Sequence, residues 1–469
     1  MSDDRQNKYN RLAVISILLF IIETTIDGTG RLIDFGFVSI QMILFALACL
    51  LTLNPLLCNF KETMLNPNVI ATVIFGIAVI VWTYVGFARG NESRYIRADV
   101  TSVMTFLLLP GFIATINDKR KLNTALKVFF IAASSAAVIE VLLYCMTPFL
   151  SETAIKGINT VLRRMAASIG STRVEWRIAS LYSVAMILGF YYMKNAGNKE
   201  KSLIYAAEAC MLLSLIISLT RSKWLGFAGG CVILAVLEKK EFKRLIINGA
   251  VTLLFFGIIV GIASLCYGRI MVVPEMFGRV SKTITGTEES GKTANPNEIE
   301  YKYDGNDSEY EDLYADDLPE GVIDNKQAIM DALGSDNLRK IIVSRHYRLI
   351  KEYFFTGMGL GAKMGKQWEG KSEYMYLDFL QKMGVFGFAS FIAAFFLPVI
   401  LFFKNLYRQP GYDRDGPTAY IISGYLSLAV VSIFNPYLTN PMGIIILLMC
   451  ASAVTIDGGL NDKPKQTAN

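Results

Sequence analysis

The chain has 469 residues, of which 53% are apolar, 12% aromatic and only 18% charged, and its formal net charge is +6. This composition excludes an ordinary soluble enzyme, because so much apolar surface would not stay in water, and the lipid bilayer is the expected solvent. The small positive charge does not favour nucleic acid as a partner, and the seven cysteines have no spacing typical of a metal site or a disulfide framework.

Apolar runs recur along almost the whole chain. A helix needs about 20 mostly apolar residues to cross a hydrocarbon core about 30 Å thick, and twelve runs meet or approach that length. The runs cover 12–27, 36–54, 69–88, 99–116, 124–147, 178–194, 203–219, 222–237, 245–266, 383–403, 417–434 and 442–456. The sequence therefore predicts an all-α polytopic membrane protein with about twelve transmembrane helices.

The connections between these runs indicate sidedness, because Lys and Arg near the end of a span resist translocation. Basic residues gather in alternate connections, on the same face as the basic N-terminal segment. These connections are 118–121, 194–201, 239–244 and 404–414. We therefore expect both termini to be cytoplasmic. Residues 1–266 then carry helices one to nine, 267–382 form a large extracytoplasmic loop, and 383–469 carry helices ten to twelve and a cytoplasmic tail.

The long loop has two parts of different character. Residues 288–324 contain thirteen acidic residues against two lysines, a composition typical of a solvated and loosely ordered segment. From residue 329 to residue 355, apolar side chains return at helical spacing, which predicts a structured external helix.

Two arginines stand at span edges on the predicted outer face. Arg177 opens one span, and Arg221 lies in the short turn between two others. A guanidinium on the face where positive charge is disfavoured indicates an anionic partner, such as a lipid phosphate or pyrophosphate. Snorkelling of the side chains to lipid headgroups explains the positions equally well.

A second group of polar residues lies in the last third of the chain. Arg345, His346 and Arg348 precede the alternating glycines of 357–361, and Glu373 follows them. Alternating glycines normally form a flexible turn, and a lone histidine between two arginines is more often a structural donor than a base. Glu373 has its own structural interpretation, as an acid in the first turn of the next helix.

The order of these pieces resembles the bacterial O-antigen ligase and polysaccharide polymerase family, over roughly residues 170 to 400. The series runs from Arg177 and Thr220-Arg221-Ser222 to Arg345 and Arg348, then Gly357-Met-Gly-Leu-Gly361, Glu373-Tyr-Met-Tyr-Leu377 and Gly384-Val-Phe-Gly387. In the ligase branch a histidine follows the glycine turn and is the proposed base. Glu373 occupies the matching place here, which favours the polymerase branch.

The resemblance implies a metal-independent glycosyltransferase of the bacterial cytoplasmic (inner) membrane that needs no cofactor. Its donor would be an oligosaccharide linked to a polyprenyl pyrophosphate, and its acceptor the sugar hydroxyl of another lipid-linked repeat unit. Cations would stabilise the leaving pyrophosphate, and a base would deprotonate the acceptor. The implied pyrophosphate-binding residues are Arg177, Arg221, Arg345 and Arg348. Glu373 is the first candidate for the base and His346 the second. Membrane lipid, a chain-length regulator and a flippase are the further expected partners.

Three alternatives remain open at the level of the sequence. A ligase would transfer the glycan to a lipid or protein acceptor. A transporter of lipid-linked glycan or of solutes is compatible with twelve helices, and Glu140 and Glu208 inside spans leave a proton-coupled route open. A sensor without catalysis would tolerate alanine at Arg177, Arg221 and Glu373.

Overall fold

The computed structural model describes most of the chain in two compact units. The described residues are 3–27, 38–162, 164, 167–169, 174–194, 196–218, 220–267, 342–363, 374–408 and 416–458. We call Met1–Phe75, Thr101–Val273 and Ile392–Asn469 the bundle unit, and Gly76–Val100 with Pro274–Phe391 the loop unit. The acidic segment 288–324 and Glu373 lie outside the described residues.

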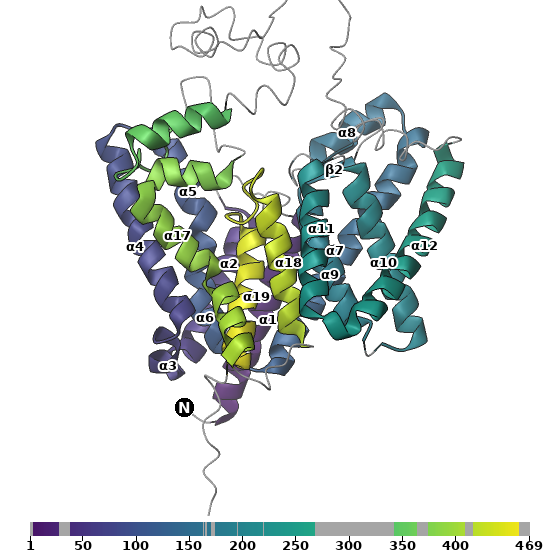
Figure 1. Ribbon diagram of the computed structural model, residues 1–469, viewed down its shortest axis with the longest axis horizontal. Helices are drawn as coiled ribbons and strands as arrows, with labels where there is room; N and C mark the ends of the chain where they lie inside the picture. Colours follow the sequence, from purple (N-terminus) through teal and green to yellow (C-terminus); the bar gives the residue numbers. More distant parts are fainter. Residues whose placement is uncertain are drawn as a thin grey trace, which may run out of the picture. The chain divides into compact units, whose positions relative to one another are not determined.

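Helices account for nearly all described secondary structure (Figure 1). In chain order they are α1 (Asp3–Asp27), α2 (Ile40–Cys58), α3 (Phe60–Met64), α4 (Pro67–Ala88), α5 (Ser93–Val103), η1 (Met104–Leu108), α6 (Leu109–Thr115), α7 (Lys119–Met146), η2 (Thr147–Phe149), α8 (Glu152–Leu162), α9 (Ala179–Tyr192), α10 (Asn198–Ile217), α11 (Arg221–Leu237), η4 (Lys239–Glu241), α12 (Phe242–Tyr267), α17 (Met375–Arg408), α18 (Pro417–Val431) and α19 (Pro441–Asp457). A further helix covers 342–352.

This architecture confirms the predicted all-α polytopic membrane fold. Every predicted apolar run overlaps a described helix, and seven helical stretches of the described residues are long and apolar enough to cross a membrane. They are Asn7–Asp27, Ile40–Cys58, Pro67–Ala88, Ser93–Thr115, Lys119–Met146, Lys239–Ile262 and Met375–Arg408. The helices Ala179–Tyr192, Pro417–Val431 and Pro441–Asp457 are apolar but shorter. The number twelve therefore stays a prediction.

The fourth apolar run is a broken helix. The sequence predicts one span over 99–116, whereas the structure has α5, then the 3-10 turn η1, then α6. Pro110 lies at the start of α6, where a missing N–H costs nothing, and it would not fit inside a continuous helix. The break leaves α5 as a separate helix with polar residues.

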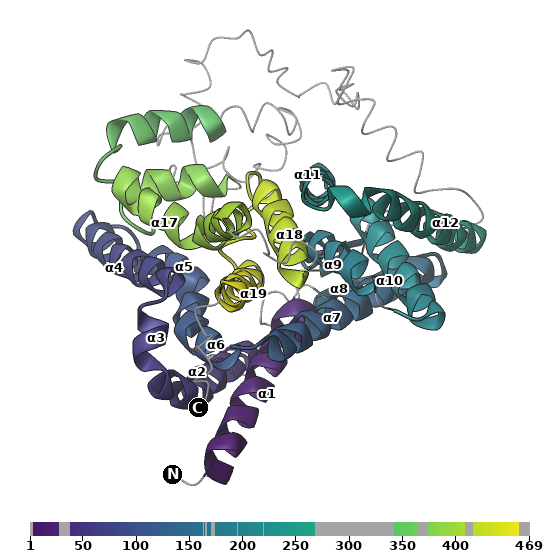
Figure 2. The ribbon, with the colours of Figure 1, turned by 60° about the horizontal axis from the view of Figure 1, so that its bottom comes forward.

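The core of the bundle unit is built around α9, whose residues from Ala179 to Phe190 are all buried. Helices α18 and α11 pack beside it, as Figure 2 shows. Gly226 and Gly230 of α11 face α18 so closely that a Cβ on either would meet Ser427. Small residues of this kind let helix backbones approach in a membrane, where packing drives association.

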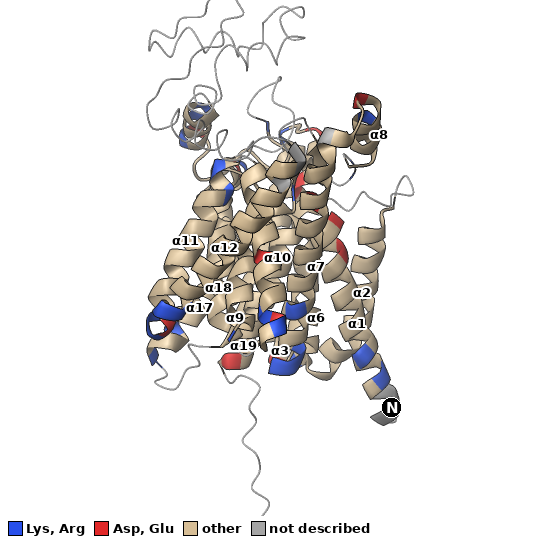
Figure 3. Ribbon diagram, turned by 90° about the vertical axis from the view of Figure 1, so that its right-hand side faces the viewer, with Lys and Arg blue, Asp and Glu red and all other residues tan. Residues whose placement is uncertain are grey.

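Contacts between connections support the predicted grouping of the loops. Lys194 lies 3.3 Å from Glu238, and Lys119 lies 3.5 Å from Asp457, so connections predicted to be cytoplasmic meet one another in the bundle unit. Figure 3 shows Lys and Arg mainly near helix ends, with few in the middle of the helices. Which end faces the cytoplasm stays a prediction.

A short β-ribbon interrupts the helices before α9. Strand β1 (Ala167–Ile169) pairs antiparallel with β2 (Val174–Trp176), with Ala167 opposite Trp176. The side chain of Asn159 in α8 holds the ribbon, since its Nδ2 donates to the Ile169 carbonyl at 2.8 Å and its Oδ1 accepts from the Ile169 N–H at 2.7 Å.

The helix predicted over 329–355 is confirmed in part, while its place outside the membrane stays a prediction. Residues 342–352 are helical, and 329–341 lie outside the described residues. The next described helix, α17, starts at Met375 and contains a break at Gly384, where φ is 59°. These elements of the loop unit carry the second group of polar residues.

Candidate functional site

Arg177 lies between the β-ribbon and α9. Trp176 ends β2 with only 2% of its surface exposed, which anchors the chain just before the arginine. The carbonyl of Arg177 accepts hydrogen bonds from the N–H of Ser180 at 3.2 Å and from its Oγ at 3.1 Å. The backbone of Arg177 is therefore fixed at the start of α9, and its side chain is half-buried.

Arg221 is the first residue of α11 and is also half-buried. The indole N–H of Trp224 donates to the Leu215 carbonyl at 2.8 Å and so ties the start of α11 to the end of α10. Helices α9, α10 and α11 follow one another through short turns, so α9 and α11 run in the same direction. Arg177 and Arg221 consequently lie at the same end of the bundle unit.

The first turn of α11 carries a third cation, which was not predicted from the sequence. Lys223 is only 1% exposed and stands three and seven residues before Gly226 and Gly230, on the helix face that packs against α18. Its neighbour Ser222 accepts a hydrogen bond from the Nδ2 of Asn435 at 3.1 Å. The helical spacing from the two glycines was the signal that could have indicated an inward-pointing lysine.

In the loop unit, Arg345 and Arg348 share the helix 342–352. Arg345 is half-buried and Arg348 is exposed, while Ile342 and Ile350 are buried on another face. The two arginines are three residues apart, so they are neighbours on the helix surface. The structure thus brings these two predicted residues together.

His346 lies on the buried face of the same helix. Its exposed fraction is 0%, and its side chain is hydrogen-bonded with that of Gln381 in α17. Burial lowers the pKa of His346 to about 4, so the imidazole is neutral at pH 7. This environment favours a structural role over that of a base that reaches substrate.

The three alternating glycines have a demanding backbone geometry. Gly357, Gly359 and Gly361 have φ of 63°, 82° and 78°, in the left-handed region that favours glycine. A Cβ on Gly359 would collide with the backbone of Gly86 in α4, and one on Gly361 would lie 2.7 Å from the backbone nitrogen of Ile96 in α5. We call residues 357–361 the glycine loop. Close backbone contact explains its composition, whereas the sequence alone suggests a flexible turn.

The break in α17 supplies the partners of the glycine loop. The N–H of Met358 donates to the carbonyl of Gln381 at 2.9 Å, and the N–H of Gly359 donates to the carbonyl of Lys382 at 2.8 Å. In an uninterrupted helix these two carbonyls would accept from amides four residues further on. Gly384 ends that pattern, which leaves both carbonyls available to the loop.

The two glycine motifs therefore meet at one backbone junction. The N–H of Val385, which the break frees, donates to the carbonyl of Phe354 at 2.8 Å. A Cβ on Gly384 would lie 2.7 Å from the nitrogen of Gly357, so neither glycine can be replaced without a shift of the backbone. The motifs at 357–361 and 384–387, separate in sequence, form a single structural element.

Residues 206–392 match the O-antigen ligase family. Over this part of its length, the chain is similar to that family. The match confirms the predicted resemblance over these residues and includes Arg221, the glycine loop and the break in α17, while Arg177 precedes it. No curated protein matches the chain at a significant level.

The family that residues 206–392 match indicates the general kind of function. Members of the family are glycosyltransferase-like enzymes that act as ligases or polymerases on lipid-linked glycans. With its many apolar helices, the chain is an integral protein of the inner membrane, where the family implies a lipid-linked oligosaccharide as substrate.

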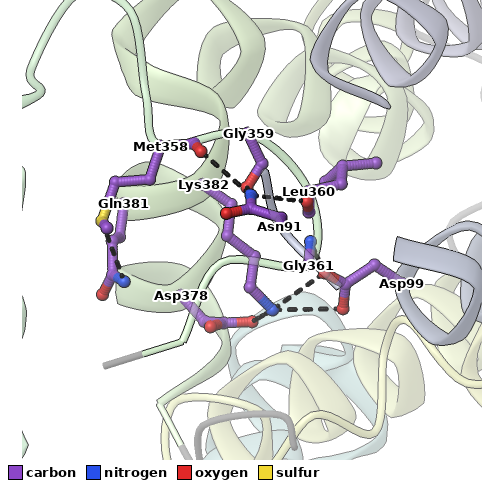
Figure 4. A network of polar contacts seen from close by, with 9 residues as sticks. All are labelled: Asn91, Asp99, Met358, Gly359, Leu360, Gly361, Asp378, Gln381 and Lys382. Atoms are coloured by element: carbon purple, nitrogen blue, oxygen red, sulfur yellow. Dashed lines mark hydrogen bonds and ion pairs between the residues drawn. The ribbon is translucent and has the colours of Figure 1, made fainter. Parts of the chain in front are cut away.

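A buried ion cluster lies beside the glycine loop in the loop unit (Figure 4). The Nζ of Lys382 is 2.9 Å from Oδ2 of Asp378 and 3.0 Å from Oδ2 of Asp99 in α5. These side chains are at most 10% exposed. The same oxygen of Asp99 accepts the N–H of Gly361 at 2.8 Å, so the cluster is connected to the loop.

The candidate base Glu373 lies outside the described residues, one position before the described Tyr374. Within the described ranges, no three His, Cys, Asp or Glu residues form a group that could hold a metal ion. The metal-independent reaction and the role of Glu373 both stay predictions.

Proposed function

We propose that the protein is a polymerase of polysaccharide repeat units. It transfers a glycan from its polyprenyl pyrophosphate carrier to a sugar hydroxyl of another lipid-linked repeat unit, at the outer face of the cytoplasmic membrane. The match of residues 206–392 to the O-antigen ligase family carries this proposal. The polymerase branch is favoured because Glu373 stands where the ligase branch has its histidine.

The arginines have the role of stabilising the leaving group. Cleavage of the bond between the anomeric carbon and the phosphate oxygen leaves negative charge on the lipid pyrophosphate. Guanidinium groups bind phosphate oxygens with two parallel hydrogen bonds and stay protonated, so they stabilise this charge without a metal. The residues proposed for this role are Arg177, Arg221, Arg345 and Arg348.

The carboxylate of Glu373 is the proposed base. It removes the proton from the acceptor hydroxyl while the hydroxyl oxygen attacks the anomeric carbon. A new glycosidic bond forms, the carbon–phosphate oxygen bond breaks, and the polyprenyl pyrophosphate leaves. A single displacement of this kind inverts the configuration of the anomeric carbon. The buried environment of His346 supports a structural role and leaves it as the second candidate.

An acceptor assay tests this function. Purified protein incubated with lipid-linked repeat units alone should produce a ladder of longer glycans on lipid. A ligase would instead transfer glycan only after addition of a lipid A core or a protein acceptor. In vesicles, translocation of lipid-linked units without lengthening would support a transporter and contradict the proposal.

The membrane orientation is a further part of the proposal. Both termini face the cytoplasm, the segment 267–382 is extracytoplasmic, and a chain-length regulator and a flippase act with the polymerase. Cysteine labelling from either side of the membrane tests the orientation. Labelling of positions beside Arg177, Arg221 and Glu373 from opposite sides would exclude a common substrate for these residues.

A further inference from the structure

The side chain of Asn91 holds the glycine loop from the α4 side. Gly90, with φ of 77°, ends α4, and the N–H of Asn91 donates to the carbonyl of Gly86 at 2.9 Å. The Nδ2 of Asn91 then donates to the carbonyl of Leu360 at 2.9 Å and to that of Met358 at 3.2 Å (Figure 4). A longer contact of 3.5 Å reaches the carbonyl of Gly359, so one carboxamide faces three successive carbonyls of the loop.

The chemistry of this contact requires an amide. A carboxamide supplies N–H donors to these carbonyl acceptors, whereas a carboxylate has only acceptors and would repel them. Asn91 is half-buried, so water competes with these bonds less than it would at an open surface. Replacement by aspartate would keep the size of the side chain, remove its donors and place a negative charge beside the carbonyls.

Asp99 holds the other end of the loop. Its carboxylate accepts the N–H of Gly361 at 2.8 Å and pairs with Lys382, which also pairs with Asp378 in α17. Asn91 and Asp99 therefore fix the glycine loop at both ends, and each uses a side chain from the segment that follows α4. A charge-assisted bond to a buried N–H is stronger than a neutral one.

The fixed loop also determines where the helix 342–352 lies within the loop unit. The helix leads directly into the loop through the bond from the N–H of Gly357 to the carbonyl of Tyr353, at 2.8 Å. Arg89, at the end of α4, stacks its guanidinium over the ring of Tyr353 at 4.7 Å and donates to Oγ1 of Thr356 at 3.1 Å. The helix that bears the candidate arginines is thus anchored through the same elements.

We propose that Asn91 and Asp99 are positioning residues for the glycosyl transfer. They hold the glycine loop so that the helix 342–352 presents Arg345 and Arg348 to the pyrophosphate of the donor. This inference rests on the proposed function, because it needs those arginines to bind the donor. Small displacements of such groups are costly, since catalysis depends on their positions to within about 1 Å.

The test uses the full-length protein and lipid-linked repeat units as substrate. The variants Asn91→Asp and Asp99→Asn should raise the KM for the donor about tenfold with a smaller change in kcat. Hydrogen exchange should become faster at the amides of 358–361. Asn91→Gln keeps both donors but moves them by one methylene, so it is a milder variant with a smaller expected rise in KM.

Asn59→Asp is a matched control. The Nδ2 of Asn59 donates to the carbonyl of Pro55 at 3.2 Å, at the end of α2 in the bundle unit. Loss of this hydrogen bond should leave the KM unchanged. An unchanged KM in Asn91→Asp, Asn91→Gln and Asp99→Asn would overturn the inference, whether or not loop exchange changes.

The arginine variants separate this inference from the proposed function. If Arg345→Ala and Arg348→Ala raise the KM but the Asn91 and Asp99 variants do not, only the positioning role fails. If the arginine variants also leave the KM unchanged, both the proposed role of the two arginines and the positioning role of Asn91 and Asp99 are contradicted.

Discussion

The two units support their arginines by contacts of very different range. In the bundle unit, the side chain of Asn159 holds the β-ribbon before Arg177 by two hydrogen bonds to Ile169, only 10 residues away along the chain. We call this contact the local clamp. In the loop unit, the side chain of Asn91 holds the glycine loop by a hydrogen bond to Leu360, 269 residues away along the chain. We call this contact the remote clamp. Both units use one asparagine side chain on backbone groups. The local clamp stabilises one short motif, whereas the remote clamp makes the geometry of the loop depend on the fold of the whole unit.

The two asparagines also differ in how many hydrogen bonds remain after part of the side chain is changed. Asn159 both donates to and accepts from Ile169, so the loss of its donor or of its acceptor still leaves one hydrogen bond. Asn91 only donates to the loop, and the loop has little room, because its glycines touch other backbones. We therefore expect substitutions in the loop unit to be more damaging than their counterparts in the bundle unit.

The largest effect is expected at Gly359. The variant Gly359→Ala forces alanine into a φ of 82° and drives its Cβ into the backbone of Gly86, so the free energy of unfolding should fall by at least about 1–3 kcal/mol, and activity should be lost. Thermal unfolding in detergent and the acceptor assay measure both effects. The control Gly229→Ala meets only Val430 at 3.8 Å and should behave like the wild type. Equal unfolding temperatures for the two variants would contradict the tight docking of the loop.

The next largest effect is expected at the arginines of the bundle unit. Arg177→Ala and Arg221→Ala should each lower kcat/KM about 10²-fold, since each removes a cation that we propose stabilises the leaving pyrophosphate. Arg244→Ala is the matched control. Its ion pair with Glu241, at 3.3 Å, lies in the basic connection at the other end of α11, so activity should not change. Full activity in both site variants would leave snorkelling as the better explanation of these positions.

A smaller effect is expected at the local clamp. Asn159→Asp keeps the acceptor for the Ile169 N–H and loses only the donor to the Ile169 carbonyl, so kcat/KM should fall by about threefold. Steady-state kinetics of Asn159→Asp and Asn91→Asp compares the fall in kcat/KM that follows the loss of the donor in each clamp. A larger loss for Asn159→Asp than for Asn91→Asp would reverse the proposed order of the two units.

The smallest effect on activity is expected at His346. His346→Gln should keep kcat within about threefold at pH 7 and leave the pH profile unchanged, since a buried histidine with a structural role can be replaced by another hydrogen-bonding side chain. A loss comparable to that of Glu373→Gln would make His346 the base.

Stability should depend on pH through the same residue. The pKa of His346 is lowered from 6.5 to about 4 by burial, so protonation favours the unfolded state between these values. The contribution of the neutral imidazole is complete above pH 6.5 and is lost as the pH falls towards 4, by roughly 3 kcal/mol at most. Unfolding of wild type and His346→Gln between pH 4 and 7 measures it, and parallel curves would contradict the burial effect.

Local patterns in the sequence predicted the fold well. Each apolar run is a helix because burial in a bilayer depends on the composition of a continuous segment, and the spacing from Ile342 to Ile350 predicted the external helix. The break at Pro110 was predictable in principle but was hidden by the apolar residues around it. The β-ribbon was missed because strands of three residues are too short to show alternation.

The candidate site could be predicted only as a set of residues. The order of arginines and glycines indicated the family, and the match over 206–392 confirmed it. The roles of Asn91 and Asp99 could not be predicted, because their partners are more than 250 residues away and no local pattern connects them. Lys223 was missed because its only local signal is the helical spacing from Gly226 and Gly230, and this spacing indicates burial only once the packing of α11 against α18 is known.

The break in α17 places two sets of donors in competition for the same acceptors. The carbonyls of Gln381 and Lys382 bind the amides of the glycine loop when Gly384 adopts its positive φ. An uninterrupted helix would offer them the amides of Val385 and Phe386 instead. A straight α17 would therefore make the amides of the loop share both acceptors with the helix, which would weaken the hold on the loop.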